Sequence, residues 1–317
     1  MAIQTKLGKA FEFACLQSLY SYLSNSQDVT IDQTNALYTA RDSFNYADAT
    51  MQRKMIEGAD AATRIIFRLE PQLEHPLKNI PLFLSIQEDS TGNAGDVRDI
   101  ICIRRQNQWE MGLSCKHNHA AVKHSRLSPN IDFGDSWFGI PCTQDYYNEI
   151  NPLFDELTEL KDNGVLWRNI NNKEQRFYIP LLQAFMNELR RLDTANPGII
   201  PSKLLHYLLG RNDFYKVITH DRRRVTQVQS FNIHATLNRS AGTSRSLVNV
   251  PQLTMPNRFY DINFKPRSGN TILVACDNGW TISMRIHSAR SLVEPSLKFD
   301  VGLTGVPPAL HTQFEPW

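Results

Sequence analysis

Apolar residues recur three and four positions apart near the start of the chain and again in its middle. Between Lys6 and Leu23 this spacing predicts an amphipathic helix, whose apolar positions are Leu7, Phe11, Ala14, Cys15, Leu19 and Tyr22. Residues 35–70 predict one or two further helices that end before Pro71, and residues 143–209 return to the helical spacing.

Short β-rich runs replace this spacing between Pro81 and Ser114, and strands are predicted again from Val225 onward. The later strands include a hairpin that turns at Asp277, Asn278 and Gly279. The chain therefore predicts an α/β (α+β) fold, with a mixed sheet flanked by helices and a C-terminal β-rich extension. A boundary near residues 210–225 would separate a core of residues 1–215, with helical elaboration, from a β-rich region of residues 216–317. One continuous domain decorated by a C-terminal sheet is the equal alternative.

The segment Gly95–His119 predicts a hairpin whose turn centres on residues 106–108. Two residues that face each other across this hairpin would then have numbers that sum to about 213 to 215. Asp99 would therefore face Ser114, Cys115 or Lys116. Side chains alternate between the two faces of a strand, so Ser114 and Lys116 share a side, and a two-residue loop puts Asp99 on that side too. The charged groups are therefore expected to gather at one edge of the sheet.

An aspartate and a lysine held on a rigid sheet, with a third acidic group nearby, suit phosphodiester hydrolysis. Carboxylate oxygens bind Mg²⁺, which stabilises charge on the phosphate and generates hydroxide. An ammonium group can orient that water or neutralise the pentavalent state. An ordinary solvated salt bridge is the structural alternative, because acidic and basic residues at strand ends occur in many proteins.

The composition narrows the class of protein. The 317 residues are 41% apolar, which is enough for a sizeable core. The formal net charge is only +2, so a polyanion would have to be bound by local clusters of basic residues and not by the overall charge. No apolar run long enough to cross a membrane and no signal peptide is evident, so we expect a soluble cytoplasmic protein with no membrane partner. The five cysteines are an odd number without regular spacing, which favours reduced thiols.

Basic residues gather in three places, and Lys, Arg and His are residue types that contact phosphates or base edges. Eleven residues hold the first group, namely Lys116, His117, His119, Lys123, His124 and Arg126. The second group lies among Asn, Gln, Ser and Thr and consists of Arg222, Arg223, Arg224, Arg239 and Arg245. The third is Arg285, His287 and Arg290. A solvated basic loop is the structural alternative for the arginine triplet of the second group, and a cap on the C-terminal sheet is the alternative for the third. The first group, beside the hairpin, favours the nuclease interpretation, and the sequence does not rank the second group against the third.

Other chemistries have weaker signals. Cys102, Cys115, His117 and His119 are zinc-ligand types, but no CxxC or HxxxH pair accompanies them. The tripeptide His117–His119 is not a nuclease motif by itself, despite its letters. No phosphate-binding GxxxxGK[ST] loop occurs, so no nucleotide cofactor is expected.

Several longer strings are more specific than these spacings. The strings are "GDVRDI", "SCKHNHAAVKHSRLS", "IDFG" with Trp137, "GIPC" and "MRIHSARSLVEPSLKFDVGL". Together they resemble the HaeIII-type restriction endonucleases over nearly the whole chain. The resemblance implies a type II restriction enzyme with a PD-(D/E)xK nuclease fold. Such an enzyme would make Mg²⁺-dependent double-strand cuts in duplex DNA at a short palindrome, with GGCC as the expected site.

The resemblance also implies roles for residues and partners. Asp99 would match the motif aspartate and Lys116 the motif lysine, and the β-rich region 216–317 would contact DNA. A cognate DNA methyltransferase would protect the host's sites as a functional partner, and a palindromic site suggests a homodimer.

The sequence departs from the family motif two residues before the lysine, where Ser114 replaces an acidic residue. Related nucleases move that residue to a helix packed on the same strands, and Glu12 is the candidate here, because burial of a carboxylate is costly unless it is paired or binds a cation. A pair with Lys9 is the structural alternative. Asp96 is the reserve ligand, or it shapes the turn after Gly95. Cys115, beside the motif lysine, is a further candidate metal ligand.

Two other function classes stay open at this point. A sequence-specific DNA-binding protein without catalysis would use the hairpin charges as ordinary salt bridges. A nuclease of different specificity, acting on damaged or single-stranded nucleic acid, would favour aromatic platforms over paired arginines.

Overall fold

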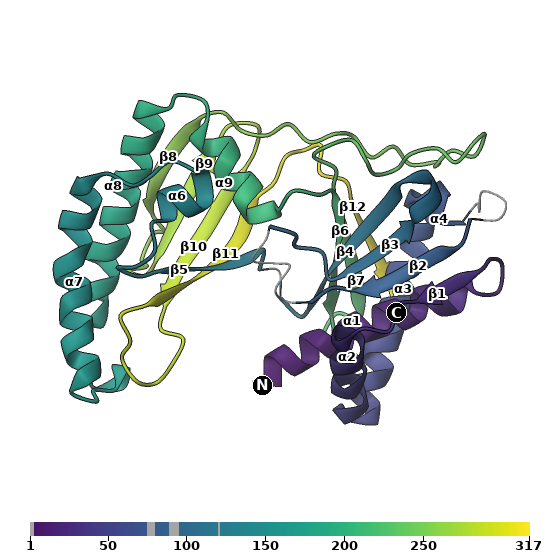
Figure 1. Ribbon diagram of the computed structural model, residues 1–317, viewed down its shortest axis with the longest axis horizontal. Coiled ribbons are helices and arrows are strands. Elements are labelled where there is room, and N and C mark those ends of the chain that lie inside the picture. Colours follow the sequence, from purple (N-terminus) through teal and green to yellow (C-terminus); the bar gives the residue numbers. More distant parts are fainter. Residues whose placement is uncertain (1–2, 75–79, 89–94, 120) are drawn as a thin grey trace. The chain divides into compact units, whose positions relative to one another are not determined.

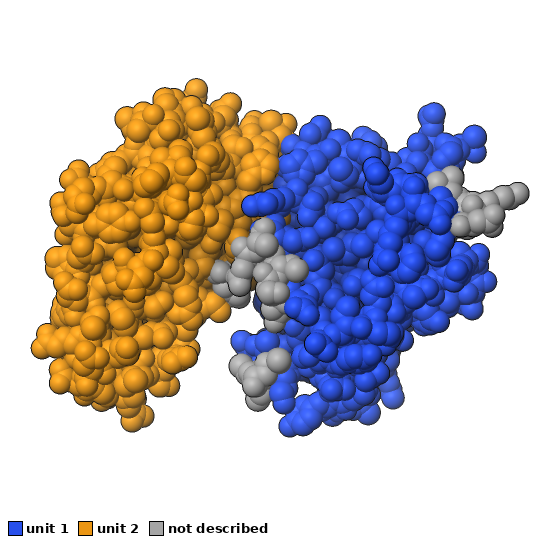
Figure 2. All heavy atoms as spheres, in the orientation of Figure 1, with its two compact units in different colours: residues 1–120, 211–253, 308–317 blue, residues 121–210, 254–307 orange. Residues whose placement is uncertain are grey.

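The structure is a computed structural model that describes residues 3–74, 80–88, 95–119 and 121–317. It divides into two compact units, coloured separately in Figure 2. Unit 1 consists of Met1–Ala120, Arg211–Leu253 and Pro308–Trp317, and unit 2 consists of Ala121–Gly210 and Thr254–Pro307. Each unit is therefore assembled from separate stretches of chain.

Unit 1 is a mixed sheet with helices on one face (Figure 1). In the described residues its helices are α1 (Ile3–Leu23), α2 (Asn35–Tyr46), α3 (Ala49–Leu69) and the short α4 (Pro71–Glu74). Its strands are β1 (Val29–Ile31), β2 (Leu82–Ile86), β3 (Ile100–Arg104), β4 (Trp109–His117), β6 (Phe214–His220), β7 (Val225–Phe231) and β12 (Thr312–Pro316). The strand order is β1-β2-β3-β4-β6-β7-β12, with β1–β2 and β4–β6 parallel and the other neighbours antiparallel.

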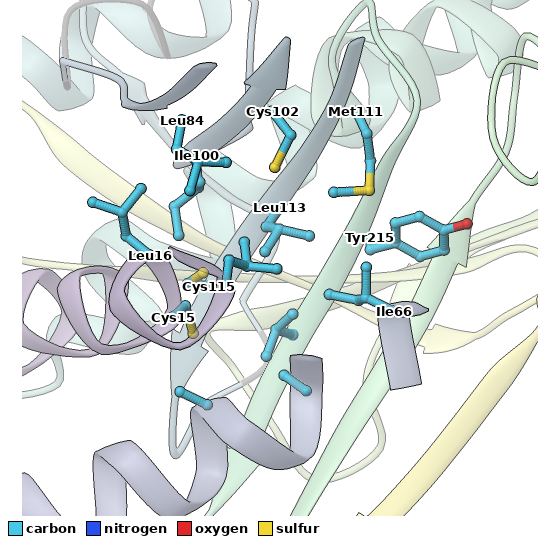
Figure 3. Close-up of a cluster of buried hydrophobic side chains, with 14 of the residues drawn as sticks. Cys15, Leu16, Ile66, Leu84, Ile100, Cys102, Met111, Leu113, Cys115 and Tyr215 are labelled. Atoms are coloured by element: carbon cyan, nitrogen blue, oxygen red, sulfur yellow. The ribbon is translucent and has the colours of Figure 1, made fainter. Parts of the chain in front are cut away.

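The core of unit 1 lies between the sheet and helices α1 and α3. Alternate residues of β4 face it, and Figure 3 shows Met111, Leu113 and Cys115 beside Cys15 of α1 and Ile66 of α3. Helix α1 is buried around most of its circumference, including Lys9 and Glu12, which differs from the predicted amphipathic helix. A helix is buried in this way when neighbouring elements cover more than one of its faces.

Unit 2 contains a second sheet, which is antiparallel, with the strand order β5-β11-β10-β9-β8. Its described strands are β5 (Lys123–Leu127), β8 (Phe259–Phe264), β9 (Thr271–Cys276), β10 (Thr281–His287) and β11 (Leu297–Gly305). The helices are α6 (Phe133–Phe138), α7 (Gln144–Asp162), α8 (Ile179–Ala195) and α9 (Ile200–Leu209), with short turns at Trp167–Asn169 and Glu174–Tyr178. Aromatic side chains join the layers, as where Phe185 of α8 meets Phe299 of β11.

The helices predicted at the start and in the middle of the chain, the strands between Pro81 and Ser114 and the hairpin at Asp277–Gly279 are confirmed. Tyr22 differs from its predicted burial and is 43% exposed.

The C-terminal strands are arranged differently from the predicted extension. The stretch around the expected boundary at 210–225 forms β6, a buried strand inside the larger sheet, because Phe214, Tyr215, Val217 and Ile218 pack on both of its faces. Strands β7 and β12 belong to unit 1, whereas β8 to β11 belong to unit 2. The β-rich region 216–317 thus contributes to both units instead of forming one extension.

Two features bear on the chain's environment. Among the described residues, no helix is long and apolar enough to cross a membrane. All five cysteines are buried free thiols, as the spacing predicted.

Candidate active site

The β3–β4 hairpin brings the predicted aspartate and lysine together. Ile100 pairs with Leu113, and the Asp99 amide donates to the Leu113 carbonyl at 2.7 Å. Asp99 therefore stands just before β3 and opposite Ser114, which is one of the three predicted partners. The predicted register is confirmed.

Three donors on β4 surround one oxygen of the Asp99 carboxylate. Oδ2 accepts from the Cys115 amide at 2.6 Å and from Lys116 Nζ at 3.2 Å, and it lies 3.5 Å from Ser114 Oγ. Burial lowers the pKa of Lys116, but the carboxylates of Asp99 and Glu12 outweigh burial and raise it. The lysine is therefore a cation fixed beside the aspartate.

Glu12 reaches the same place from helix α1. Its side chain is buried, with 6% of the residue exposed, and it accepts a hydrogen bond from Lys9 Nζ at 3.0 Å. Burial and the neighbouring Asp99 carboxylate raise the pKa of Glu12 to about 8, against the opposing effects of Lys9 and Lys116. Glu12 thus pairs with Lys9, as the structural alternative predicted, and it also lies within electrostatic range of Asp99 and Lys116.

Lys216 is a second buried lysine at this site, and the sequence analysis missed it. It lies on β6 directly beside Ser114 of β4 and is 3% exposed. Burial and the charge of Lys116 lower the pKa of Lys216 to about 7, and Asp99 opposes that effect. Across three neighbouring strands, Asp99, Ser114 and Lys216 form one row. The signal in the sequence was a lysine inside the apolar run Phe214–Ile218.

Asp96 has a different environment from Asp99. Its carboxylate accepts from Nε and Nη2 of Arg98, from the Arg98 amide and from Asn212 Nδ2. Burial raises the pKa of Asp96, but the Arg98 guanidinium outweighs it and lowers the pKa. Arg98 also forms a salt bridge to Glu110, with Nη1 2.7 Å from Oε1. Its side chain lies over Gly112, where a Cβ atom would be only 2.0 Å from Arg98 Cδ, so only glycine fits there. Asp96 therefore supports the turn before β3, the second of the two roles predicted for it.

The side chains of Cys115 and His117 point into the core and not toward the row of charged residues. The Cys115 thiol interacts with Cys15, and this contact together with burial holds its pKa well above the usual range (Figure 3). A protonated, buried thiol is a poor metal ligand. His117 is 8% exposed, lies against Phe11 and contacts Asp221 at 3.2 Å. Neither side chain is presented where it could meet DNA.

The other predicted basic residues divide between the units. Unit 1 holds a group that is exposed throughout, namely His119, Arg222, Arg223, Arg224 and Arg239. Unit 2 holds Lys123, His124, Arg126, Arg285 and His287.

Several of these residues already have protein partners. Arg224 pairs with Glu57 at 3.3 Å and Arg285 pairs with Asp300 at 3.3 Å. Arg126 pairs with Glu294, and His287 Nδ1 contacts the Ser288 carbonyl. Lys123 donates to the Tyr207 carbonyl at 2.9 Å, and burial lowers its pKa to about 8. His124 lies on β5, and its side chain is outside the described part of the structure.

The two carboxylates at the sheet edge suit a hard divalent cation. Burial and the Asp99 carboxylate disfavour the charged form of Glu12, and a cation held between the two groups would favour that charged form. In the described residues no group of three or more His, Cys, Asp or Glu side chains gathers to hold a metal ion, so a protein cage is absent from that part of the chain. Mg²⁺ commonly binds through one or two carboxylates and completes its shell with water and substrate phosphate. The donor set therefore fits Mg²⁺ better than the zinc alternative.

A mixed sheet flanked by helices, with two carboxylates and a lysine at one edge, defines the class as restriction-endonuclease-like. A model of the HaeIII restriction endonuclease family matches residues 8–307. The chain is 40% identical over 310 residues to Type II restriction enzyme HaeIII of Haemophilus aegyptius. The matched region covers 98% of this chain and 97% of that protein. The chain therefore belongs to the HaeIII restriction endonuclease family. The comparison with solved structures found no significant match.

Proposed function

We propose that the protein is a Mg²⁺-dependent endonuclease that makes double-strand cuts in duplex DNA at a short palindrome, with GGCC as the expected site. The observation that carries this proposal is the contact between Asp99 and Lys116 at one end of the β3–β4 hairpin, with the buried Glu12 near enough to act on both electrostatically. Family membership supports duplex DNA as the substrate. The expected GGCC site rests on the resemblance to this family.

The three residues would divide the work of phosphodiester hydrolysis. Asp99 and Glu12 would hold the metal ion, which when bound stabilises charge on the phosphate and lowers the pKa of water. Lys116 keeps its proton beside Asp99, so its ammonium group can orient the attacking water and offset charge on the phosphate. Ser114 leaves β4 with no carboxylate at the family's acidic position, and Glu12 would supply it from α1.

Lys9 has a positioning role in this scheme. Its ammonium group holds Glu12 in the absence of metal, at 3.0 Å, and shields the buried carboxylate. A cation bound by Glu12 and Asp99 would share this carboxylate with the lysine. The site is therefore held together before any ligand arrives.

The remaining partners follow from the proposed activity. An enzyme that cuts a common four-base-pair site requires a cognate DNA methyltransferase to protect the host's DNA. A palindromic substrate has two-fold symmetry, so a homodimer would present one active site to each strand.

The test is incubation of purified protein with linear duplex DNA that carries one GGCC site. We expect two discrete fragments with Mg²⁺ and none in excess chelator, with single-stranded DNA left intact. Binding without cutting would support the non-catalytic alternative instead. Cutting of single strands only, or full cutting in chelator, would refute the proposal.

A further inference from the structure

Unit 1 contains a polar pocket of about 380 Å³ away from the carboxylates. Its walls are the turn between β3 and β4 at Asn107–Glu110, the segment Arg211–Asp213, Arg98, and the loop from His234 to Gly242. The pocket lies at the turn end of the hairpin, whereas Asp99 and Ser114 lie at the other end. Trp109 and Ser114 are five residues apart on β4, which corresponds to about 17 Å along an antiparallel strand.

The wall formed by residues 233–239 is held in one conformation by a buried carboxylate. Asp213 accepts four hydrogen bonds from this loop, from the amides of Ile233, His234 and Thr236 and from Thr236 Oγ1, at 2.6 to 2.8 Å. The loop includes Ala235 at φ 56°, in the left-handed region that is costly for a residue with a Cβ atom. The loop is thus preorganised by its hydrogen bonds to Asp213, which itself belongs to the pocket wall.

A second buried carboxylate fixes the end of the same loop. Glu70 accepts from the Asn238 amide at 2.6 Å and from the Tyr215 hydroxyl at 2.7 Å. Asn238 also has a left-handed backbone, with φ 60°. The residue that follows, Arg239, is therefore presented from a rigid base.

Hydrogen-bond donors dominate the pocket. Arg211 and Arg239 both line the pocket and are exposed, and neither forms an ion pair within the described residues, although Arg239 Nε donates to the Ala235 carbonyl. Trp109 is 7% exposed, and its Nε1 finds no hydrogen-bond acceptor in the part of the chain that the structure describes. The indole belongs to the pocket wall, but this N–H is itself buried and is not a donor that the pocket presents.

The acidic groups of the pocket are already engaged. Both oxygens of Asp213 accept from the loop, and Glu110 pairs with Arg98 at 2.7 Å. The guanidinium groups of Arg211 and Arg239 therefore remain without an acidic partner in the described part of the chain, and their positive charge favours a negatively charged ligand. Guanidinium groups that no acidic side chain engages suit an anion such as phosphate, because arginine presents several N–H donors to phosphate oxygens.

We infer that this pocket binds a backbone phosphate of duplex DNA other than the one that is cut. The inference rests on the proposed function for the identity of the ligand, and it joins Arg239 of the second basic group to Arg211, which the sequence did not single out, in one anchoring contact. Phosphate contacts of this kind fix the position of a protein on the duplex without reading its sequence.

The test measures duplex affinity against salt concentration, without Mg²⁺, for wild type, Arg211→Ala and Arg239→Ala. Each variant should bind about 3- to 10-fold more weakly, and the slope of log affinity against log salt should fall by about one, since one phosphate contact is lost. Arg239→Lys should keep the slope because it keeps the charge. Arg41→Ala, an exposed arginine of α2 outside the pocket, is the matched control and should bind like wild type. Thermal melting confirms that each variant is folded.

A scan of duplexes with single neutral methylphosphonate linkages locates the contact. In wild type, one phosphate outside the scissile bond should be sensitive, and Arg239→Ala should make that position insensitive. Unchanged salt slopes and an unchanged scan in both alanine variants would overturn the inference.

Calorimetry with inorganic phosphate separates two sources of the same chemistry. Binding of inorganic phosphate through both arginines, with the duplex scan unchanged, would assign the pocket to a free phosphate compound and overturn the DNA contact. Wild type that neither binds nor cuts duplex DNA would instead refute the proposed function itself, and the inference with it.

Discussion

At the scale of single residues, the site depends on where two carboxylates and two lysines lie relative to one sheet edge. Asp99 and Lys116 were predictable, because strand alternation and turn length fix which side chains share a face. Glu12 was predictable as a costly carboxylate near apolar neighbours. Lys216 was not identified, since its closeness to Ser114 requires a parallel pairing between strands almost a hundred residues apart in the chain.

Removing either half of the Asp99–Lys116 pair should abolish cleavage. Asp99→Ala removes a metal ligand, and Lys116→Ala removes the cation beside it. We therefore expect the cleavage rate to fall by roughly a thousand-fold or more, as it does when a metal site is lost. Duplex binding without Mg²⁺ should stay within a few-fold of wild type. Gel-shift and single-turnover cleavage assays check both statements, and near-normal turnover in either variant would remove the hairpin from the active site.

Glu12→Gln tests whether α1 supplies the acidic group that is missing at Ser114. The amide keeps the shape but loses the charge, so the Mg²⁺ concentration for half-maximal cutting should rise and the rate should fall by a large factor. Asp96→Asn is the matched control, since Asp96 is engaged by Arg98, and it should reduce cutting less. The opposite ranking in a Mg²⁺ titration would move the metal ligand to Asp96.

Lys216→Met keeps an unbranched apolar side chain that is one atom shorter and removes the amino group from the row with Asp99 and Ser114. We expect a fall of about 10- to 100-fold in the single-turnover rate, with little change in duplex affinity, because the side chain is buried at the site and does not face solvent. A structural role alone would lower the melting temperature and leave the rate constant of the folded enzyme unchanged. Measurement of both quantities distinguishes the two roles.

At the scale of elements, the periodicity of apolar residues predicted the helices and strands that local sequence determines. It failed for the strands that form because of contacts with distant parts of the chain. Helix α1 and strands β3 and β4 have clear spacing and were predicted. Strand β5 is the basic run Lys123–Leu127, without an apolar alternation, and it forms only because β11 pairs with it. Strand β6 follows α9 closely and is buried on both faces, so its short apolar run lacks the alternation of a half-exposed strand.

The end of α3 gives a prediction about pH and stability. Burial raises the pKa of Glu70 to about 7, although the Asn238 amide, the Tyr215 hydroxyl and the charge of Arg239 oppose this effect. The unfolded chain ionises this carboxyl near pH 4.5, so the free energy of unfolding should fall as the pH rises from about 4.5 to about 7. The contribution is on the order of 3 kcal/mol.

Glu70→Gln removes that ionisation and keeps an acceptor for Asn238 and Tyr215. Urea unfolding should show that the free energy of unfolding falls less between pH 5 and pH 8 in the variant than in wild type. The variant should therefore gain more stability relative to wild type at pH 8 than at pH 5. Equal losses in both proteins would show that the ionisation of Glu70 does not contribute to this dependence.

At the scale of the whole molecule, the two units are built from interleaved stretches of chain. The chain from Ala121 to Gly210 leaves unit 1 after β4, builds part of unit 2 and returns to form β6 beside β4. A sequence pattern shows neither this crossover nor which sheet each C-terminal strand joins, because both depend on contacts between distant segments. The candidate carboxylates and Lys116 are nevertheless all in unit 1, while predicted basic residues lie in both units.

One measurement tests the central claim, that this site makes site-specific cuts in duplex DNA. Wild type and Asp99→Ala are incubated with a duplex library of random sequence and Mg²⁺, and the ends of all products are sequenced. We expect the wild-type ends to fall within one palindrome, GGCC, and the variant, folded and still binding duplex DNA, to yield no ends above background. Ends spread over unrelated sequences, or the same ends from Asp99→Ala, would contradict the claim.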